Sequence, residues 1–399
     1  WATGETNITI SGTAKINART DQGGAGIGSG SDATGNTNIT ISGGTIENAQ
    51  GGSGGAGIGS GDGSTGQTTV TIKSGTIKNA TGGNTGDGIG GGCDSKNITV
   101  KIEGGTIEKA KGGDGYGSHD AGDGIHSDGE LTIPDKATIV SAIGGNGDSR
   151  NSSSNAGHGI YSKGDLNISD NATIGTAKGG DGTADDGTGG TGIYSAGRLF
   201  ISGGEIQNAT GGNGGSGGSG IRGDYVVNIS GGIIKNAEGT GGGAGIGGGA
   251  NSFQDTTINI SGGTIEKATG GVGGGAGIGS GKGSTGETKI DITQDALVYA
   301  YGSGGAAIGS GESSTGKTTV NIHDTTAGKG VKHAFAYDGA GIGSGHYASG
   351  QTYITIRNAS VSSLESSADS TNNPGAGIGS GKGAKGNTAI TIEGSTVKA

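Results

Sequence analysis

One isoleucine returns along the chain at a nearly constant interval, in segments such as GGAGIGSG at 23–30 and 54–61. The isoleucines at the centre of these segments are Ile27, Ile58, Ile89, Ile125, Ile160, Ile193, Ile221, Ile246, Ile278, Ile308, Ile342 and Ile378. The steps between them average about 32 residues, a period typical of solenoids, in which each repeat packs only on its neighbours. The spacing therefore predicts a stack of similar coils.

Each repeat contains three short segments of alternating apolar and polar residues, such as AGIGSG, TVTIKSG and TIKNA, separated by glycine-rich turns. Such alternation is typical of strands. One repeat has too few large apolar side chains to fold alone, but stacked parallel strands can align like residues in ladders. Because strand crossovers are almost always right-handed, we expect an all-β fold: a right-handed parallel β-helix of about twelve three-strand coils. We expect a single β-solenoid over residues 1–399, as part of a longer repetitive, exported protein.

Composition excludes several classes of protein. The chain has 103 glycines and 2 prolines in 399 residues, but the glycines lack the strict three-residue period of collagen. Hydrophobic residues make up 28% of the chain and gather in the strand-like segments, which argues against disorder. The net charge of −10 argues against nucleic acid as a partner. No apolar run is long enough to cross a bilayer, so we expect no membrane insertion.

The glycines that flank the repeated isoleucine allow two interpretations. By strand alternation Gly26, Gly28 and Gly30 face outward while the isoleucine faces inward. In the first interpretation the backbone needs a positive φ or a corner too tight for a Cβ atom. In the second, the bare backbone allows close approach of a flat partner, either a polysaccharide or a second solenoid. The second interpretation predicts self-association through this glycine face.

Four consecutive repeats replace the glycine after the isoleucine by a large residue, and these are His126, Tyr161, Tyr194 and Arg222. The strand register places them in one outward column, about 4.8 Å apart per coil. The loops beside the column are also longer, so we expect a groove. Tyrosine rings with neighbouring polar groups are typical of sugar-binding surfaces, which predicts that the column binds an extended, acidic glycan. The alternative is that the rings only support one another across adjacent strands.

The long loops are rich in aspartate, and this raises the question of a metal site. The segments DAGDG and DGTADDG contain Asp120, Asp123, Asp181 and Asp185, whose carboxylates could hold calcium, although no complete calcium motif is present. The alternative is that they are solvated turn residues. His119, His126 and His158 lie in the same region, but a transition metal needs three or four converging ligands, which the sequence does not show. The single cysteine, Cys93, can form no internal disulfide. We expect no obligatory cofactor.

Several phrases carry a resemblance to known proteins. The segments GDGIHSDGELTI, GHGIYSKGDLNISDNATI and ISGGTIENAQGG resemble the coils of glycine-rich, right-handed β-helix surface proteins of anaerobic bacteria. These include adhesin-like proteins and clostridial carbohydrate-binding β-helix proteins that recognise acidic plant polysaccharides with calcium. The resemblance implies an extracellular, cell-surface location and a role in adhesion or carbohydrate binding. It carries over no functional residue, because the GAGIGSG coils depart from the more acidic GDGI pattern.

Three classes of function remain open. The first is a surface-displayed binding or adhesion solenoid without enzymatic activity, with a polysaccharide or a host or cell-surface glycan as its partner. The second is a structural spacer or filament subunit. The third is a polysaccharide lyase or hydrolase, which needs paired carboxylates or a basic residue in a cleft, and for which the aspartate-rich loops with Arg150 and Arg222 are candidates.

Overall fold

The computed structural model describes residues 3–151, 154–169, 171–183, 187–367 and 374–398. Strands, turns and bends make up these residues, and no helix is found among them. Accordingly, the described part of the chain contains no helix that is long and apolar enough to cross a membrane. Contacts divide the chain into two compact units, Trp1–Gly197 with Gly212–Gly215, and Arg198–Gly211 with Ser216–Ala399. A single solenoid over 1–399 stays a prediction.

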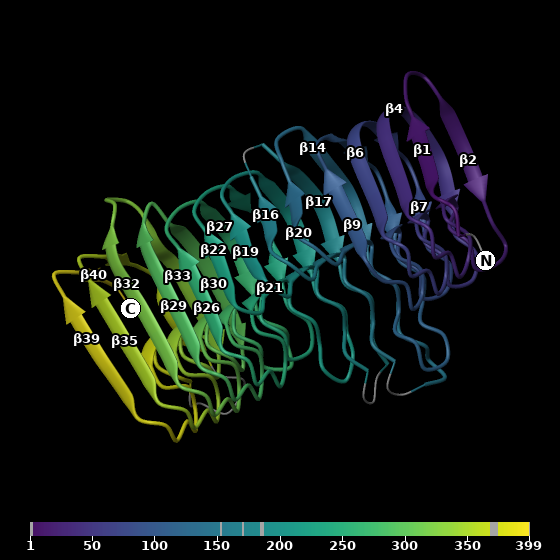
Figure 1. Ribbon diagram of the computed structural model, residues 1–399. Coiled ribbons are helices and arrows are strands. Elements are labelled where there is room, and N and C mark those ends of the chain that lie inside the picture. The colour runs from purple at the N-terminus through teal and green to yellow at the C-terminus, as the bar shows by residue number, and fades with distance from the viewer. Residues whose placement is uncertain (1–2, 152–153, 170, 184–186, 368–373, 399) are drawn as a thin grey trace. The chain divides into compact units, whose positions relative to one another are not determined.

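The first unit is built from three ladders of parallel strands (Figure 1). The ladder of the repeated isoleucine contains β3 (Ile27–Gly28), β5 (Ile58–Gly59), β8 (Ile89–Gly90), β12 (Ile125–Ser127), β15 (Ile160–Ser162) and β18 (Ile193–Ser195). The second contains β1 (Thr6–Ile10), β4 (Thr37–Gln50), β6 (Thr68–Ile77) and β9 (Ile98–Ile102). It continues at the same place in the following coils with β13 (Leu131–Ile133) and β16 (Leu166–Ile168), which pair with each other but not with β9. The third contains β2 (Lys15–Arg19), the ends of β4 and β6, β7 (Ala80–Thr81), β10 (Gly105–Ile107), β11 (Ala110–Lys111), β14 (Ala137–Ile143) and β17 (Thr173–Lys178).

The second unit repeats this arrangement. Its isoleucine ladder contains β21 (Ile221–Gly223), β25 (Ile246–Gly247), β28 (Ile278–Gly279), β31 (Ile308–Gly309), β34 (Ile342–Gly343) and β38 (Ile378–Gly379). The second ladder contains β19 (Arg198–Ile201), β22 (Val226–Ile229), β26 (Thr256–Ile260), β29 (Thr288–Gln294), β32 (Thr318–Thr325), β35 (Thr352–Arg357) and β39 (Thr388–Glu393). The third contains β20 (Glu205–Thr210), β23 (Ile233–Ile234), β24 (Ala237–Glu238), β27 (Thr264–Thr269), β30 (Leu297–Ser303), β33 (Gly330–Tyr337), β36 (Ser360–Val361), β37 (Leu364–Ser367) and β40 (Thr396–Val397).

Like residues stack in register through each unit, as the period predicts. Ile27 pairs with Ile58 and Ile58 with Ile89, and all three side chains are buried. No coil has a core of its own, so each isoleucine is buried mainly by its equivalents above and below. The prediction of a right-handed parallel β-helix is confirmed.

The glycine after the repeated isoleucine is required by the backbone. In the coils that keep this glycine and whose isoleucine strand is two residues long, its φ lies between 130° and 153°, a region that side chains rarely allow. A Cβ atom at Gly59 would lie 1.8 Å from the carbonyl oxygen of Gly90 in the next coil. The first interpretation is therefore confirmed for Gly26 and Gly28, but not for Gly30, where a Cβ atom would meet nothing within 4 Å. The expected bare surface is not open in this coil, because Gly57, Gly59 and Gly61 are buried. Self-association stays a prediction.

In several of these coils the residue after this glycine is a buried serine that connects one coil to the next. Ser29 Oγ accepts the backbone N–H of Gly61, and Ser60 Oγ accepts that of Gly92, both at 3.1 Å. The same bond recurs in the second unit, where Ser280 Oγ accepts the N–H of Gly311 at 3.0 Å. A hydroxyl is small enough for the interior and supplies the acceptor that the turn backbone lacks.

The first unit contains two types of coil, which differ at one corner. After β3, β5 and β8 the chain takes a long corner, and after β12 and β15 a short one; these corners are 29–36, 60–67 and 91–97, and 128–130 and 163–165. The short corner accompanies a three-residue isoleucine strand. Its second residue, His126 or Tyr161, does not have a positive φ. The side chain at this position thus belongs to a change of coil geometry, a structural reason for the break in the glycine pattern.

Candidate functional site

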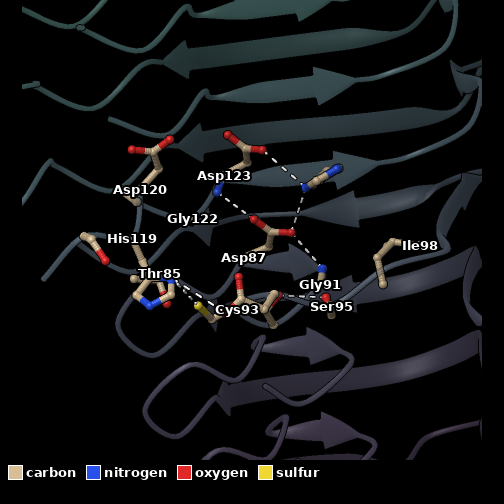
Figure 2. Close-up of a pocket in the computed structure, with 15 residues that line it drawn as sticks. Thr85, Asp87, Gly91, Cys93, Ser95, Ile98, His119, Asp120, Gly122 and Asp123 are labelled. Carbon is tan, nitrogen blue, oxygen red and sulfur yellow. Dashed lines mark hydrogen bonds and ion pairs between the residues drawn. The ribbon is translucent and has the colours of Figure 1, made fainter. Parts of the chain in front are cut away.

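A pocket lies in the first unit where the two types of coil meet. The long corner 91–97 is followed in the next coil by the short corner 128–130, which does not extend far enough to cover it. The opening is a pocket of about 420 Å³. Its lining includes Asp87, Cys93, His119, Asp120 and Asp123, which Figure 2 shows around it. The pocket is therefore a product of the unequal corners.

Side chains replace the missing strand pairing at this junction. The N–H of Ile98 donates to Asp128 Oδ2 at 2.9 Å, and the N–H of Val100 donates to Ser127 Oγ at 3.2 Å. The carbonyl of Ile98 in turn accepts the N–H of Asp128 at 2.8 Å. These bonds satisfy the backbone of β9 where no strand of the next coil pairs with it along its length. They also hold the residues next to His126 in place.

His126 lies among three carboxylates at the inner end of the pocket. Its Nδ1 is 3.1 Å from Asp87 Oδ2 and 3.4 Å from Asp123 Oδ2, while its Nε2 is 3.7 Å from Asp128 Oδ1. Asp87 and Asp123 are buried. Their other oxygens accept backbone N–H groups, Asp87 Oδ1 from Asp123 at 2.7 Å and Asp123 Oδ1 from His158 at 2.5 Å. The cluster is rigid because each carboxylate is fixed by a neighbouring coil.

This arrangement shifts the proton affinities of the cluster. Burial, and after it the charge of Asp87, raise the pKa of Asp123 to about 7. Burial alone would lower the pKa of His126, but the charge of Asp87 and the nearby carboxylates of Asp128 and Asp123 raise it well above its usual value. The nearby imidazole of His126 holds the pKa of Asp128 well below its usual range. These shifts favour a positively charged His126 that forms ion pairs with the surrounding carboxylates.

The three members of the predicted column that lie in the first unit are aligned. His126 pairs with Tyr161, and Tyr161 with Tyr194, in successive strands. The ring centroids are 5.0 Å apart in the first pair and 5.1 Å in the second. Arg222 belongs to the second unit, where its Nε lies 2.8 Å from Asp224 Oδ1. The alignment of the three rings is confirmed, and ligand binding by His126, Tyr161, Tyr194 and Arg222 stays a prediction.

The orientation of the rings limits what they can present to a ligand. The planes of Tyr161 and Tyr194 are 17° from parallel, so the two rings face each other along the stacking direction of the coils. His158 packs against the edge of this pair, with centroids 5.2 Å and 4.8 Å from those of Tyr161 and Tyr194. Between the two tyrosines no ring face is left open. The half-buried column therefore forms a ridge of ring edges, and mutual support of the rings accounts for the contacts between them.

The predicted calcium ligands take part in ladders of polar side chains. In these ladders a side-chain oxygen accepts the backbone N–H of the equivalent residue in the next coil, and the two ladders are Asp114, Asn146, Asp181, Asn213 and Asp120, Asn155, Thr188. Asp120 and Asp181 thus lie on different ladders. Among the described residues, Asp120, Asp123 and Asp181 do not form a group of three with ligand atoms within 4.8 Å of one another. Asp185 lies outside the described residues. Calcium binding by these four residues stays a prediction.

Comparison with known proteins supports the fold. Five segments match the Beta helix repeat family. The segments are residues 8–31, 39–62, 70–93, 100–128 and 258–282. No curated protein and no solved structure matches the chain. Beta-helix repeats also occur in hydrolases and lyases, so the match does not decide between binding and catalysis. The resemblance to surface proteins of anaerobic bacteria remains an expectation.

Three residues at or beside the pocket were not predicted from the sequence. Asp87 lines the pocket at the position that Ala56 has in the preceding coil, and Asp128 lies beside the pocket in the short corner. Cys93 was considered only for disulfides, yet its Sγ lies 3.5 Å from His119 Nδ1. The one sequence signal for Asp87 was the change from GAGIG at residues 55–59 to GDGIG at residues 86–90. Nothing in the local sequence indicates that Cys93 and His119 meet.

Proposed function

We propose that the chain is a surface-displayed, extracellular binding solenoid that binds an extended carbohydrate along the ridge of His126, Tyr161 and Tyr194. One observation carries the proposal: His126 is both the first ring of the ridge and part of the pocket lining. A line of polar-edged rings is thus continuous with a polar pocket. Because the residues repeat once per coil, about 4.8 Å apart, the surface suits a linear polymer better than a compact ligand.

The chemistry of the surface fits hydroxyl-rich ligands. Ring edges of tyrosine combine apolar and polar contacts, and the exposed carboxylate of Asp120 at the pocket is a hydrogen-bond acceptor for sugar hydroxyls. The pocket lining contains four aspartates and two histidines. This excess of carboxylates favours a neutral glycan, whereas the sequence led us to expect an acidic one.

Binding is better supported than catalysis at this surface. A general acid or base must reach the substrate atom that gains or loses the proton. Asp87 and Asp123 are buried, and each already accepts a backbone N–H from a neighbouring coil. The buried position of these two carboxylates suits a structural role, which is to hold neighbouring coils together, better than a role in proton transfer. The alternative is a polysaccharide lyase or hydrolase. Release of new sugar ends from a bound glycan would support that alternative.

A glycan array tests the proposal with the wild-type protein, the double variant Tyr161→Ala/Tyr194→Ala and the control Tyr337→Ala/Tyr347→Ala. The control removes two exposed tyrosines of the second unit. Contacts of two aromatic rings are worth about 1–3 kcal/mol, so the first variant should bind roughly fivefold to 150-fold more weakly than wild type. The control should bind as wild type does. Equal binding by all three proteins would place the glycan site elsewhere, and no binding by wild type would favour the structural spacer. Repeating the array with a chelator tests whether calcium takes part in binding.

A further inference from the structure

A group of three different metal-binding side chains lies on the outer side of the same pocket. Cys93 and Asp94 belong to the long corner 91–97, and His119 belongs to the long loop of the next coil. Cys93 Sγ is 3.5 Å from His119 Nδ1, which is 3.8 Å from Asp94 Oδ2. One ligand atom from each residue lies within 4.8 Å of the other two. Figure 2 shows Cys93 and His119 turned toward each other.

These distances fit the edges of a tetrahedral metal site. Zinc binds sulfur at about 2.3 Å, nitrogen at about 2.0–2.1 Å and carboxylate oxygen at about 2.0–2.2 Å, which separates neighbouring ligand atoms by about 3.4–3.6 Å at tetrahedral angles. The observed 3.5 Å and 3.8 Å need only small side-chain rotations. We propose that Cys93, Asp94 and His119 form a binding site for a divalent transition metal of the zinc type.

The surroundings favour a cation at this position. Asp62 lines a smaller adjoining cavity of about 200 Å³ together with Cys93, Asp94 and His119. Burial raises the pKa of Asp62, and the charges of Asp94 and Asp32 raise it further, which shows that negative charge is crowded here. A divalent cation would neutralise that charge. Asp62 or a water molecule can complete the coordination, since three protein ligands leave the fourth tetrahedral position open.

The ligand set selects for a transition metal over calcium. Thiolate and imidazole groups bind zinc, cobalt and related ions, whereas calcium takes oxygen ligands. Burial raises the pKa of the Cys93 thiol, so the thiol is protonated before the metal binds. Coordination replaces the S–H bond by an S–metal bond and releases the proton to solvent. Affinity should therefore fall by about tenfold for each unit by which the pH is lowered below the thiol pKa.

The backbone holds the cysteine in position before any metal arrives. The N–H of Cys93 donates to the carbonyl of Gly54 at 2.6 Å, and the carbonyl of Cys93 accepts the N–H of Gly63 at 2.8 Å. The side chains of Asp94 and His119 are 69% and 48% exposed, which gives an ion access from solvent. The corner thus combines a fixed thiol with two ligands that can rotate to complete the site.

Cobalt titration of the full chain tests the site. The reduced, chelator-treated protein is titrated with Co²⁺ without any glycan, and thiolate-to-cobalt charge-transfer absorption is recorded. We expect saturation at one equivalent, loss of the band in Cys93→Ser, and at least about tenfold weaker binding in His119→Gln. The control His323→Gln removes a histidine that lies 3.0 Å from Asp324 but has no thiol partner, and should bind cobalt as wild type does.

Competition distinguishes the proposed site from other modes of binding. Zn²⁺ should displace cobalt, and Ca²⁺ at the same concentration should not. Absence of the charge-transfer band in the wild-type protein would overturn the proposal. Unchanged cobalt affinity in His119→Gln would also overturn it, because the thiol alone would then account for binding. Circular dichroism verifies that the variants fold. The result does not depend on glycan binding, so either proposal can fail without the other.

Discussion

Replacing Gly28 by alanine should disrupt two coils, although the neighbouring glycine of the same AGIGSG segment can be replaced freely. Gly28 has a φ of 147°, and a Cβ atom there would lie 1.7 Å from the carbonyl oxygen of Gly59. That oxygen must move by about 1.3 Å or more to reach even the 3.0 Å limit of real contacts. It now accepts the N–H of buried Ser29 at 3.2 Å. The backbone strain costs about 1–3 kcal/mol, and the unpaired N–H costs about 1–3 kcal/mol.

Gly30→Ala is the matched control, because a Cβ atom at Gly30 meets no atom within 4 Å. Its effect on stability should stay within about 0.5 kcal/mol. Because a solenoid couples nearest neighbours, hydrogen–deuterium exchange with mass spectrometry is a more sensitive assay than a melting temperature. Amides in residues 25–31 and 56–62 should exchange faster in Gly28→Ala only. Equal exchange in the two variants would refute the assigned backbone conformation and the role of glycine in it.

Two further predictions concern buried polar groups. Ser60→Ala removes the acceptor of the Gly92 N–H and should lower the free energy of unfolding by about 1–3 kcal/mol; an unchanged denaturation midpoint would show that the serine ladder contributes nothing. The pKa of His126 is raised by Asp87 and the other nearby carboxylates, so its stabilising effect is complete below pH 6.5 and is lost as the pH rises through the folded-state pKa. The raised pKa of Asp123, about 7, acts in the same direction between pH 4 and pH 7. The stability difference between wild type and His126→Gln, measured by denaturation from pH 5.5 to 9, should therefore shrink as the pH rises, and a growing difference would contradict the assigned ion pairs.

The ladders of the fold could be predicted because they depend on period and alternation alone. Ile58 lies between Ile27 and Ile89 wherever the coils repeat at a fixed length, and Tyr161 aligns with Tyr194 for the same reason. These relations need no knowledge of side-chain orientation. The fold and the alignment of His126, Tyr161 and Tyr194 could therefore be predicted correctly from the sequence.

The pocket depends on features that a period does not contain. It opens because one corner is longer than the next, and Asp128 then bonds to the exposed backbone of β9. Ring orientation is equally local: the stacking of Tyr161 on Tyr194 decides that edges, and not faces, line the ridge. Asp181 was a candidate metal ligand because aspartates in turns can either bind a metal or accept backbone N–H groups. Only the structure shows that its carboxylate oxygen accepts the N–H of Asn213.

The most direct test of the proposed function is a crystal structure of the protein with the oligosaccharide that gives the strongest array signal. The account predicts sugar residues along the edges of Tyr161 and Tyr194, with one end of the oligosaccharide in the pocket and a sugar hydroxyl within hydrogen-bonding distance of Asp120. A sugar bound against Tyr301 and Tyr337 in the second unit, with the ridge of the first unit empty, would contradict it.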